Sequence, residues 1–215
     1  MNAVKKEHQE IPDLGVVIAA GGSSRRYGQG NKLFEMLSGV PVFIHALRRF
    51  APWCRSGALI LVAPESELDE FIRQAAAYCP ELPLAAVAGG ATRCRSVANG
   101  LAALPASARY VAVHDAARPF ASAELLLRCL AAARECGGAL AARPVTDTLK
   151  KAGLNNMIAA TVDRDGLWAV ETPQVFDLEL LRDAYAAAFA AGHDFTDDAG
   201  VMEWAGHPVR LVENG

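Results

Sequence analysis

Glycine, serine and cationic side chains follow a short apolar run near the start of the chain. Residues 16–20 are apolar, and the next segment reads Gly21-Gly22-Ser23-Ser24-Arg25-Arg26-Tyr27-Gly28-Gln29-Gly30-Asn31-Lys32. Glycine lets the backbone approach a ligand with its N–H groups turned inward, while Arg25 and Lys32 supply positive charge. Leu33 stands where a Walker A loop needs Ser or Thr, and the segment does not match a dinucleotide fingerprint. We therefore predict a loop that holds the phosphates of a nucleoside triphosphate.

A carboxylate ends a second apolar run. Residues 111–115 read Val-Ala-Val-His-Asp, and Ala116-Ala117-Arg118-Pro119 follow them. A carboxylate with small neighbours at the end of a strand could bind Mg²⁺ that nucleotide phosphates carry. The alternative is that Asp115 caps a turn and pairs with Arg118. We interpret His114 as a hydrogen-bonded structural residue rather than as a base.

Two further segments could contact a ligand. Residues 89–96 read Gly-Gly-Ala-Thr-Arg-Cys-Arg-Ser and lead into a predicted helix, whose N-terminus would attract anions. A plain strand-to-helix turn is the alternative. Residues 146–151 and 161–164 bring hydroxyl and cationic side chains onto a predicted arm. Lys150 and Lys151 could instead be edge-strand charges that oppose aggregation, and we favour that interpretation for Lys151.

Strands and helices must position these segments, and short apolar runs alternate with longer amphipathic ones as in an α/β fold. The pattern predicts strands at residues 14–20, 58–63, 84–88, 110–114 and 139–142, and helices at 41–50, 67–78, 93–104 and 123–135. Ser66 and Ser122 are the expected N-caps, and Gly137 is the expected C-terminal stop. The loops at Gly21, Gly89, Asp115 and Thr146 all follow strands, so we expect them to meet at one edge of a mostly parallel sheet.

The pattern changes after Pro144. Two short strands are predicted at residues 146–151 and 158–162, with a turn at residues 153–156 between them. We expect a projecting β-arm over about residues 145–172, and because an isolated hairpin is marginal in water we expect it to pack on a second subunit. Helices at residues 178–191 and 197–205 and an apolar run at 208–212 complete a single domain over residues 1–215.

Composition excludes several classes of protein. The 215 residues are 52% hydrophobic with a net charge of −3, which argues against a nucleic-acid partner. The sequence has no apolar run of membrane-spanning length and no basic leader followed by an apolar run, so we expect a cytoplasmic protein with no membrane partner. Its five cysteines are odd in number and lack paired C-x-x-C spacing, which predicts reduced thiols.

Six segments together resemble one enzyme family. They are AAGGSSRRYGQGNK, GGATRCRSV, HDAARP, PVTDTLK, TVDRDGLW with TPQ, and TDDAG, and they occur in unbroken order from about Leu14 to the end of the chain. This combination resembles the 2-C-methyl-D-erythritol 4-phosphate cytidylyltransferases of the non-mevalonate isoprenoid pathway. The resemblance implies a Rossmann-like nucleotidyltransferase domain and a homodimer formed through the arm. It also implies transfer of CMP from CTP to 2-C-methyl-D-erythritol 4-phosphate with Mg²⁺, giving 4-diphosphocytidyl-2-C-methyl-D-erythritol and pyrophosphate.

Other readings of these segments stay open. A cytidylyltransferase for ribitol 5-phosphate uses similar loops, and sugar-1-phosphate or molybdopterin nucleotidyltransferases share the first segment more loosely. TVDRDGLW favours the methylerythritol enzyme over these two distant classes. A non-catalytic nucleotide-binding relative is the alternative from a different functional class.

The resemblance also implies roles for individual residues. The nucleotide would be bound by Ala19, Ala20, Gly21, Ser23, Gly90, Ala91, Ser96, Asp115 and Ala116, and Asp115 would also hold the metal. The catalytic cations would be Arg25, Lys32 and Arg164. The second substrate would be bound by Arg118, Thr148, Arg164 and Thr172. Arg25 is preferred to Arg26 because it keeps the family's spacing from Gly21 and to Lys32.

The sequence departs from the family pattern at three places. Many relatives carry an acidic residue at the position of Ala91 and glycine at the position of Ser23. The family also has a functional lysine shortly after the segment that matches residues 211–213, whereas this sequence stops at Gly215. We expect either that the sequence is truncated there or that another group, with Lys150 the first candidate, replaces that lysine.

Overall fold

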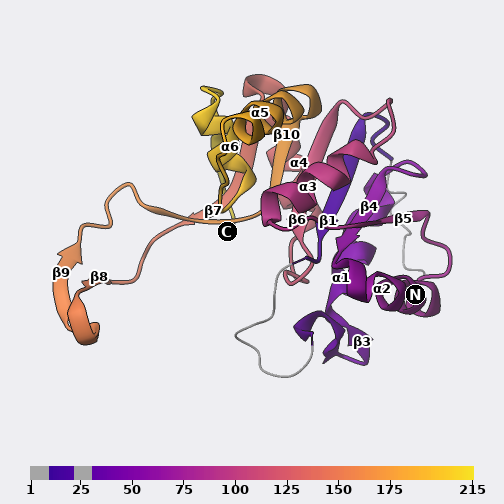
Figure 1. Cartoon of the computed structure of the whole chain (residues 1–215), viewed down its shortest axis with the longest axis horizontal. Helices are drawn as coiled ribbons and strands as arrows, with labels where there is room; N and C mark the ends of the chain where they lie inside the picture. The colour runs from indigo at the N-terminus through magenta and orange to yellow at the C-terminus, as the bar shows by residue number, and fades with distance from the viewer. Residues whose placement is uncertain (1–9, 22–30) are drawn as a thin grey trace, which may run out of the picture.

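A central β-sheet runs through the protein (Figure 1). The computed structural model describes residues 10–21 and 31–215, and within them the seven strands of this sheet have the order β11-β7-β10-β6-β1-β4-β5. The strands are β1 (Leu14–Ala19), β4 (Leu59–Ala63), β5 (Leu84–Ala88), β6 (Tyr110–Asp115), β7 (Gly138–Pro144), β10 (Trp168–Asp177) and β11 (Arg210–Glu213). All pairings are parallel except those of β10, which is antiparallel to both β6 and β7. The expected mostly parallel α/β sheet is confirmed.

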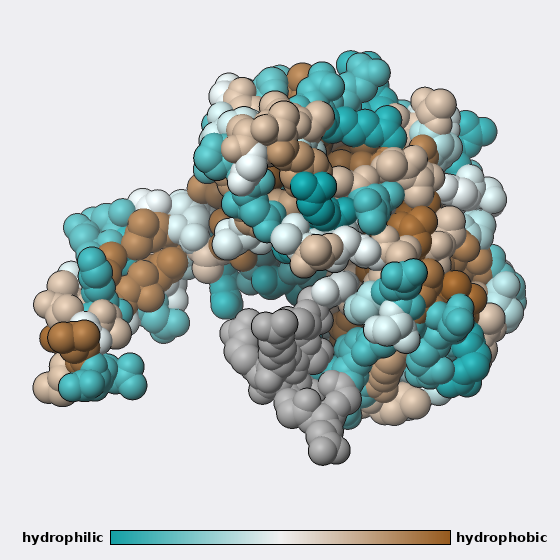
Figure 2. All heavy atoms as spheres, viewed as in Figure 1, coloured by the Kyte–Doolittle hydropathy of each residue, from teal (hydrophilic) through white to brown (hydrophobic). Residues whose placement is uncertain are grey.

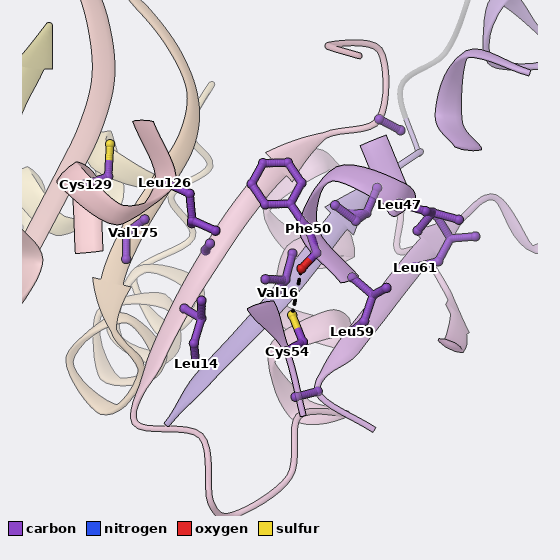
Figure 3. Packing of buried hydrophobic residues seen from close by; sticks show 14 of the residues in the cluster. Leu14, Val16, Leu47, Phe50, Cys54, Leu59, Leu61, Leu126, Cys129 and Val175 are labelled. Atoms are coloured by element: carbon purple, nitrogen blue, oxygen red, sulfur yellow. Dashed lines mark hydrogen bonds between the residues drawn. The ribbon is translucent and has the colours of Figure 1, made fainter. Parts of the chain in front are cut away.

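Helices cover both faces of the sheet. They are α1 (Val42–Phe50), α2 (Leu68–Tyr78), α3 (Arg93–Ala102), α4 (Ala123–Cys136), α5 (Leu178–Ala190) and α6 (Asp198–Trp204). Side chains of α1, α2 and α4 pack in one hydrophobic cluster, part of which Figure 3 shows, and those of α3, α5 and α6 pack in a second. Successive strand residues alternate between the clusters, so Val16 belongs to the first and Val17 to the second. Burial on both faces explains why β1 reads as a continuous apolar run.

Two of the three predicted helix boundaries are confirmed. The Ser122 hydroxyl accepts a hydrogen bond from the Leu125 N–H at 3.1 Å at the start of α4. Gly137 ends the same helix with a φ of 92°, in the left-handed region that favours glycine. The N-cap predicted at Ser66 is wrong, because Ser66 lies inside the 3₁₀ turn η3 (Glu65–Glu67) and α2 begins only at Leu68.

The arm is a separate two-stranded sheet that projects from the body (Figure 1). Its strands are β8 (Leu149–Ala152) and β9 (Ile158–Val162), with the short helix η4 (Leu154–Asn156) between them. Apolar side chains lie on the surface of the arm (Figure 2). Leu154 exposes 89%, Met157 70% and Ile158 68% of its full accessible area. The segment from Trp168 onwards, including the last residues of the range predicted for the arm, forms β10 of the main sheet.

Short elements complete the described ranges. The turns η1 (Lys32–Phe34) and η2 (Ala51–Trp53) and the small strands β2 (Met36–Leu37) and β3 (Val40–Pro41) flank α1. None of the helices in the described ranges combines the length and apolar character needed to cross a lipid bilayer.

Candidate active site

The carboxyl ends of β1 and β6 lie side by side at one edge of the sheet. Ala19 pairs with Asp115 in the parallel register, and the Ala116 N–H donates a hydrogen bond to the Ala19 carbonyl oxygen at 3.0 Å. On the other side of β1, the Ala20 N–H donates to the Val62 carbonyl oxygen of β4 at 2.7 Å. The expected convergence of the first and third predicted loops at this edge is confirmed.

The loop after β5 reaches the same edge. The Gly90 N–H donates to Ser96 Oγ at 3.0 Å, and the Ser96 hydroxyl donates to the Thr92 carbonyl oxygen at 2.8 Å. A Cβ on Gly89 would lie 2.8 Å from Ser96 Oγ, and one on Gly21 would lie 3.4 Å from it. Ser96 therefore lies close to both glycine segments, and a side chain at position 89 would displace its hydroxyl.

Asp115 projects into a pocket of about 330 Å³ between two guanidinium groups. Its Oδ2 lies 3.2 Å from Arg118 Nε, and its Oδ1 lies 3.7 Å from Arg93 Nη2. The pairing with Arg118 is therefore confirmed, while the side chain still faces a pocket. The pocket is lined by Arg93, Asp115, Arg118, Val170, Glu171, Thr172, Gln174, Thr196 and Asp197.

A chain of hydrogen bonds fixes the turn that carries Asp115. The Asp115 N–H donates to Thr172 Oγ1 at 3.2 Å, and Thr172 Oγ1 lies 3.0 Å from His114 Nδ1. His114 Nε2 lies 3.0 Å from the Arg118 carbonyl oxygen. Because that oxygen can only accept, Nε2 carries the ring proton and Nδ1 accepts from the Thr172 hydroxyl. Burial lowers the pKa of His114 from 6.5 to about 4, which keeps the ring neutral and confirms its structural role.

The TDDAG segment packs against the same pocket. Asp197 caps α6 by accepting from the Gly200 N–H at 3.2 Å, and its Oδ2 accepts from Gln174 Nε2 at 3.1 Å. Gln174 Oε1 in turn accepts from the Ala199 N–H at 3.0 Å. Asp198 is completely buried and pairs with Arg93 at 2.8 Å. Gln174 and Asp198 are not among the predicted site residues, although they lie in the TPQ and TDDAG segments that carry the resemblance.

The structure does not bring the arm residues to this pocket within one chain. Thr148 precedes β8, and Arg164 follows β9, where its guanidinium donates a hydrogen bond to the Thr146 carbonyl oxygen. Lys150 donates to Thr161 Oγ1 across the arm at 2.6 Å. Figure 1 shows the arm extending away from the body of the protein. The roles predicted for Thr148 and Arg164 therefore stay predictions that need a second chain.

The remaining predicted residues divide between described and undescribed parts of the chain. Lys32 is exposed at the start of η1, next to Asn31, whose Oδ1 accepts from the Leu33 N–H at 3.0 Å. Ala91 is exposed in the turn before α3. Ser23 and Arg25, like Arg26, lie outside the described residues. Within the described ranges, no group of three or more His, Cys, Asp or Glu side chains is arranged to hold a metal ion.

Comparisons with known proteins agree on one family. A family profile described as "IspD: 2-C-methyl-D-erythritol 4-phosphate cytidylyltransferase" matches residues 14–215. The "Bifunctional enzyme IspD/IspF" of Sinorhizobium medicae is 43% identical over 211 residues, which make up 95% of this chain and 52% of that protein. The 2-C-methyl-D-erythritol 4-phosphate cytidylyltransferase of Bacillus velezensis is 42% identical over 200 residues, covering 92% of this chain and 85% of that protein. The chain thus spans about half the length of the bifunctional relatives that it matches.

Two solved structures have the same fold. The 2-C-methyl-D-erythritol 4-phosphate cytidylyltransferase of Thermus thermophilus is 33% identical with a TM-score of 0.77. The 4-diphosphocytidyl-2C-methyl-D-erythritol synthase of Anaerococcus prevotii is 28% identical with a TM-score of 0.78. Each alignment covers 94% of this chain and 89% of the solved chain.

Proposed function

The chain belongs to the 2-C-methyl-D-erythritol 4-phosphate cytidylyltransferase family, and from that premise we propose that it transfers CMP from CTP to 2-C-methyl-D-erythritol 4-phosphate. The observation that carries the proposal is the meeting of three of the resembling segments at one sheet edge, where Ala20 follows β1, Gly90 lies in the loop after β5 and Asp115 ends β6. The names of the relatives favour this acceptor over ribitol 5-phosphate.

The proposed reaction needs no side-chain nucleophile. A phosphate monoester has a second pKa of about 6, so the acceptor phosphate is already largely dianionic at neutral pH. One of its oxygens forms a new bond to the α-phosphorus of CTP, while the bond from that phosphorus to the bridging oxygen breaks and the electron pair leaves with pyrophosphate. The protein must align two anions and offset the charge that develops on the leaving group. Lys32, Arg25 and Arg164 are the cations that we assign to this task.

The charge of the pocket supports a requirement for Mg²⁺. The charged groups lining it are two guanidiniums, Arg93 and Arg118, and three carboxylates, Asp115, Glu171 and Asp197. That balance does not by itself attract a triphosphate. Mg²⁺ commonly binds through one or two carboxylates together with substrate phosphates and water, and Asp115 is the carboxylate that fits this pattern at the end of β6. When bound, Mg²⁺ neutralises phosphate charge and orients the triphosphate.

We assign the nucleotide to the loops at the sheet edge. Ala19, Ala20, Gly21 and Ser23 would contact the triphosphate, while Gly90, Ala91, Ser96 and Ala116 would border the cytidine. A Cβ on Gly90 would lie 2.5 Å from Arg95 Cβ, so glycine is needed to keep the turn before α3 tight. Arg118 and Thr172, which line the pocket beside Asp115, are the residues that we assign to the acceptor.

A second copy of this chain is the partner that we propose for the arm. The exposed apolar residues Leu154, Met157 and Ile158 would be covered in a homodimer, and Thr148 and Arg164 would then reach the acceptor phosphate in the other subunit. We place the enzyme in the cytoplasm, and the five free thiols at Cys54, Cys79, Cys94, Cys129 and Cys136 fit a reducing compartment.

Pyrophosphate release tests this function. The protein is mixed with CTP, Mg²⁺ and one acceptor at a time: 2-C-methyl-D-erythritol 4-phosphate, ribitol 5-phosphate or a sugar 1-phosphate. We expect release with the first acceptor, and much slower release when ATP, GTP or UTP replaces CTP. Faster release with another acceptor would reassign the substrate. Binding of CTP without release for any acceptor would support a non-catalytic relative instead.

A further inference from the structure

Asp198 has a fully buried carboxylate that the proposed reaction does not use. The hydroxyl of Tyr185 donates a hydrogen bond to Oδ1, and Arg93 Nη2 donates to Oδ2 at 2.8 Å. Burial and the nearby charge of Asp198 raise the pKa of Tyr185 far above its ordinary value, so its hydroxyl remains a donor. Asp198 begins α6, Tyr185 lies on α5 and Arg93 begins α3, so one carboxylate joins three helices.

Arg93 connects this buried carboxylate to the pocket. Its Nη2 lies 2.8 Å from Asp198 Oδ2 and 3.7 Å from Asp115 Oδ1. Burial alone would lower the pKa of Arg93, but the charge of Asp198 and its hydrogen bond raise it above the ordinary value, so the cation persists. Nη1 of Arg93 is buried and has no hydrogen-bond partner among the residues that the structure describes. Because a guanidinium is a rigid fork, fixing one nitrogen sets the direction of the others.

The two arginines beside Asp115 differ in how they are held. Arg118 follows Asp115 by three residues on the same turn, and its side chain is 42% exposed. Arg93 is separated from Asp198 by 105 residues of chain and is held by a carboxylate in the interior. Arg118 is therefore part of the turn that carries Asp115, whereas Arg93 is held in place by residues outside that turn.

We propose that Arg93 is a positioning residue that acts through Asp115. Asp198 and Tyr185 fix the guanidinium, and the guanidinium orients the Asp115 carboxylate toward the pocket before the nucleotide arrives. This inference rests on the proposed function, in which Asp115 contacts the metal-bound nucleotide. It gives the TDDAG segment a role, because Asp198 is the residue that holds Arg93 in place.

Replacement of Arg93 should lower the rate of catalysis. Loss of a group that orients a metal-binding carboxylate typically lowers metal affinity or activity about 10- to 100-fold, so Arg93→Gln should lower kcat by that factor and raise the Mg²⁺ concentration at half-maximal rate. The matched control is Arg95→Gln, because Arg95 lies on the same helix with its guanidinium 4.4 Å from the Phe189 ring centroid. We expect the control to stay within about twofold of the wild type. Equal effects of the two substitutions on kcat would overturn the proposal.

Arg93→Gln also leaves the buried charge of Asp198 unpaired, which could unfold the protein. The double variant Arg93→Gln/Asp198→Asn removes both charges together, so the effect on catalysis can be measured even if Arg93→Gln alone does not fold. A double-mutant cycle then measures the coupling to Asp115. In an Asp115→Asn background, the paired substitution should lower turnover by less than about threefold, because the group that it orients is already lost. The same fold-loss with and without Asp115 would contradict a role through that carboxylate.

A measurement on the ligand-free protein separates this inference from the proposed function. The carbon-13 signal of the Asp115 carboxylate should shift in Arg93→Gln and stay in place in Arg95→Gln. The Nη2–H protons of Arg93, which bond Asp198, should exchange slowly with water in the wild type and faster in Tyr185→Phe. If neither signal responds, the positioning network does not exist. If both respond but no acceptor yields pyrophosphate, the network stands and the proposed reaction fails.

Discussion

Lowering the pH should destabilise the protein through His114. This ring is completely buried, its centroid lies 4.4 Å from that of Phe50, and its two nitrogens contact Thr172 and the Arg118 carbonyl oxygen. Burial is the main cause that lowers its pKa from 6.5 to about 4. His114 is therefore harder to protonate in the folded protein than in the unfolded chain.

The sign and size of the effect follow from proton linkage. Between pH 6.5 and about pH 4 the unfolded chain binds more protons at this residue than the folded protein does. The stability that depends on neutral His114 is fully present above pH 6.5 and is lost as the pH falls toward 4. A shift of this size corresponds to a limiting loss of about 3 kcal/mol, of which about 2 kcal/mol is lost by about pH 5.

Urea unfolding at about pH 7.5 and about pH 5 measures this loss. The free energy of unfolding of His114→Asn should fall by about 2 kcal/mol less between the two conditions than that of the wild type, because the variant has no proton to bind at this position. His193→Asn, which removes an exposed histidine, is the control and should show the wild-type loss. If His114→Asn loses as much stability as the wild type, protonation of His114 does not drive the destabilisation.

Three further predictions concern the proposed site. Thr172→Val should lower the free energy of unfolding by about 1–3 kcal/mol, because the Asp115 N–H and His114 Nδ1 lose their hydrogen-bond partner. Thr172→Ser keeps the hydroxyl and is the control. Equal thermal unfolding of the two variants would contradict the prediction. Lys32→Ala should lower turnover at saturating substrates by at least about 100-fold with unchanged circular dichroism, and near wild-type turnover would remove Lys32 from the transition state. Arg164→Ala should impair use of the acceptor far more than CTP binding, measured by calorimetry without the acceptor. Mixing Arg164→Ala chains with Lys32→Ala chains should restore activity, and no recovery in verified mixed dimers would place the site within one chain.

The parallel strands β1, β4 and β6 could be predicted because each is buried on both faces. The segments around Val17, Ile60 and Val113 are uninterrupted apolar runs, and their short length is typical of a strand buried on both faces rather than of a buried helix. Loops that follow such strands must lie at the same edge. The place of Asp115 beside Ala19 was therefore predictable from the sequence.

The central antiparallel strand was missed. In β10, Glu171, Thr172 and Pro173 interrupt the apolar pattern, and proline in a run argues against a strand in the middle of a sheet. The register between β10 and β7 shifts between Val170 and Gln174, so the interrupted segment falls where regular pairing is broken. That irregularity lets Thr172 reach Asp115, and only the folded chain shows it.

Long-range polar contacts also could not be predicted from the sequence. Arg93 and Asp198 are separated by 105 residues, and nothing in the period or composition of either segment indicates that they meet. Two adjacent aspartates at the start of a helix were the available signal. One of them, Asp197, suffices as the N-cap, which leaves Asp198 free to pair elsewhere.

The arm leaves and rejoins the main sheet at neighbouring positions. Pro144 pairs with Trp168, and the Val145 N–H donates to the Leu167 carbonyl oxygen at 3.0 Å. The arm therefore begins and ends at neighbouring paired residues of β7 and β10. The free-energy cost of closing such an excursion grows only slowly with its length. We therefore expect that the length and sequence of the arm can be changed while β7 and β10 keep their register in the main sheet.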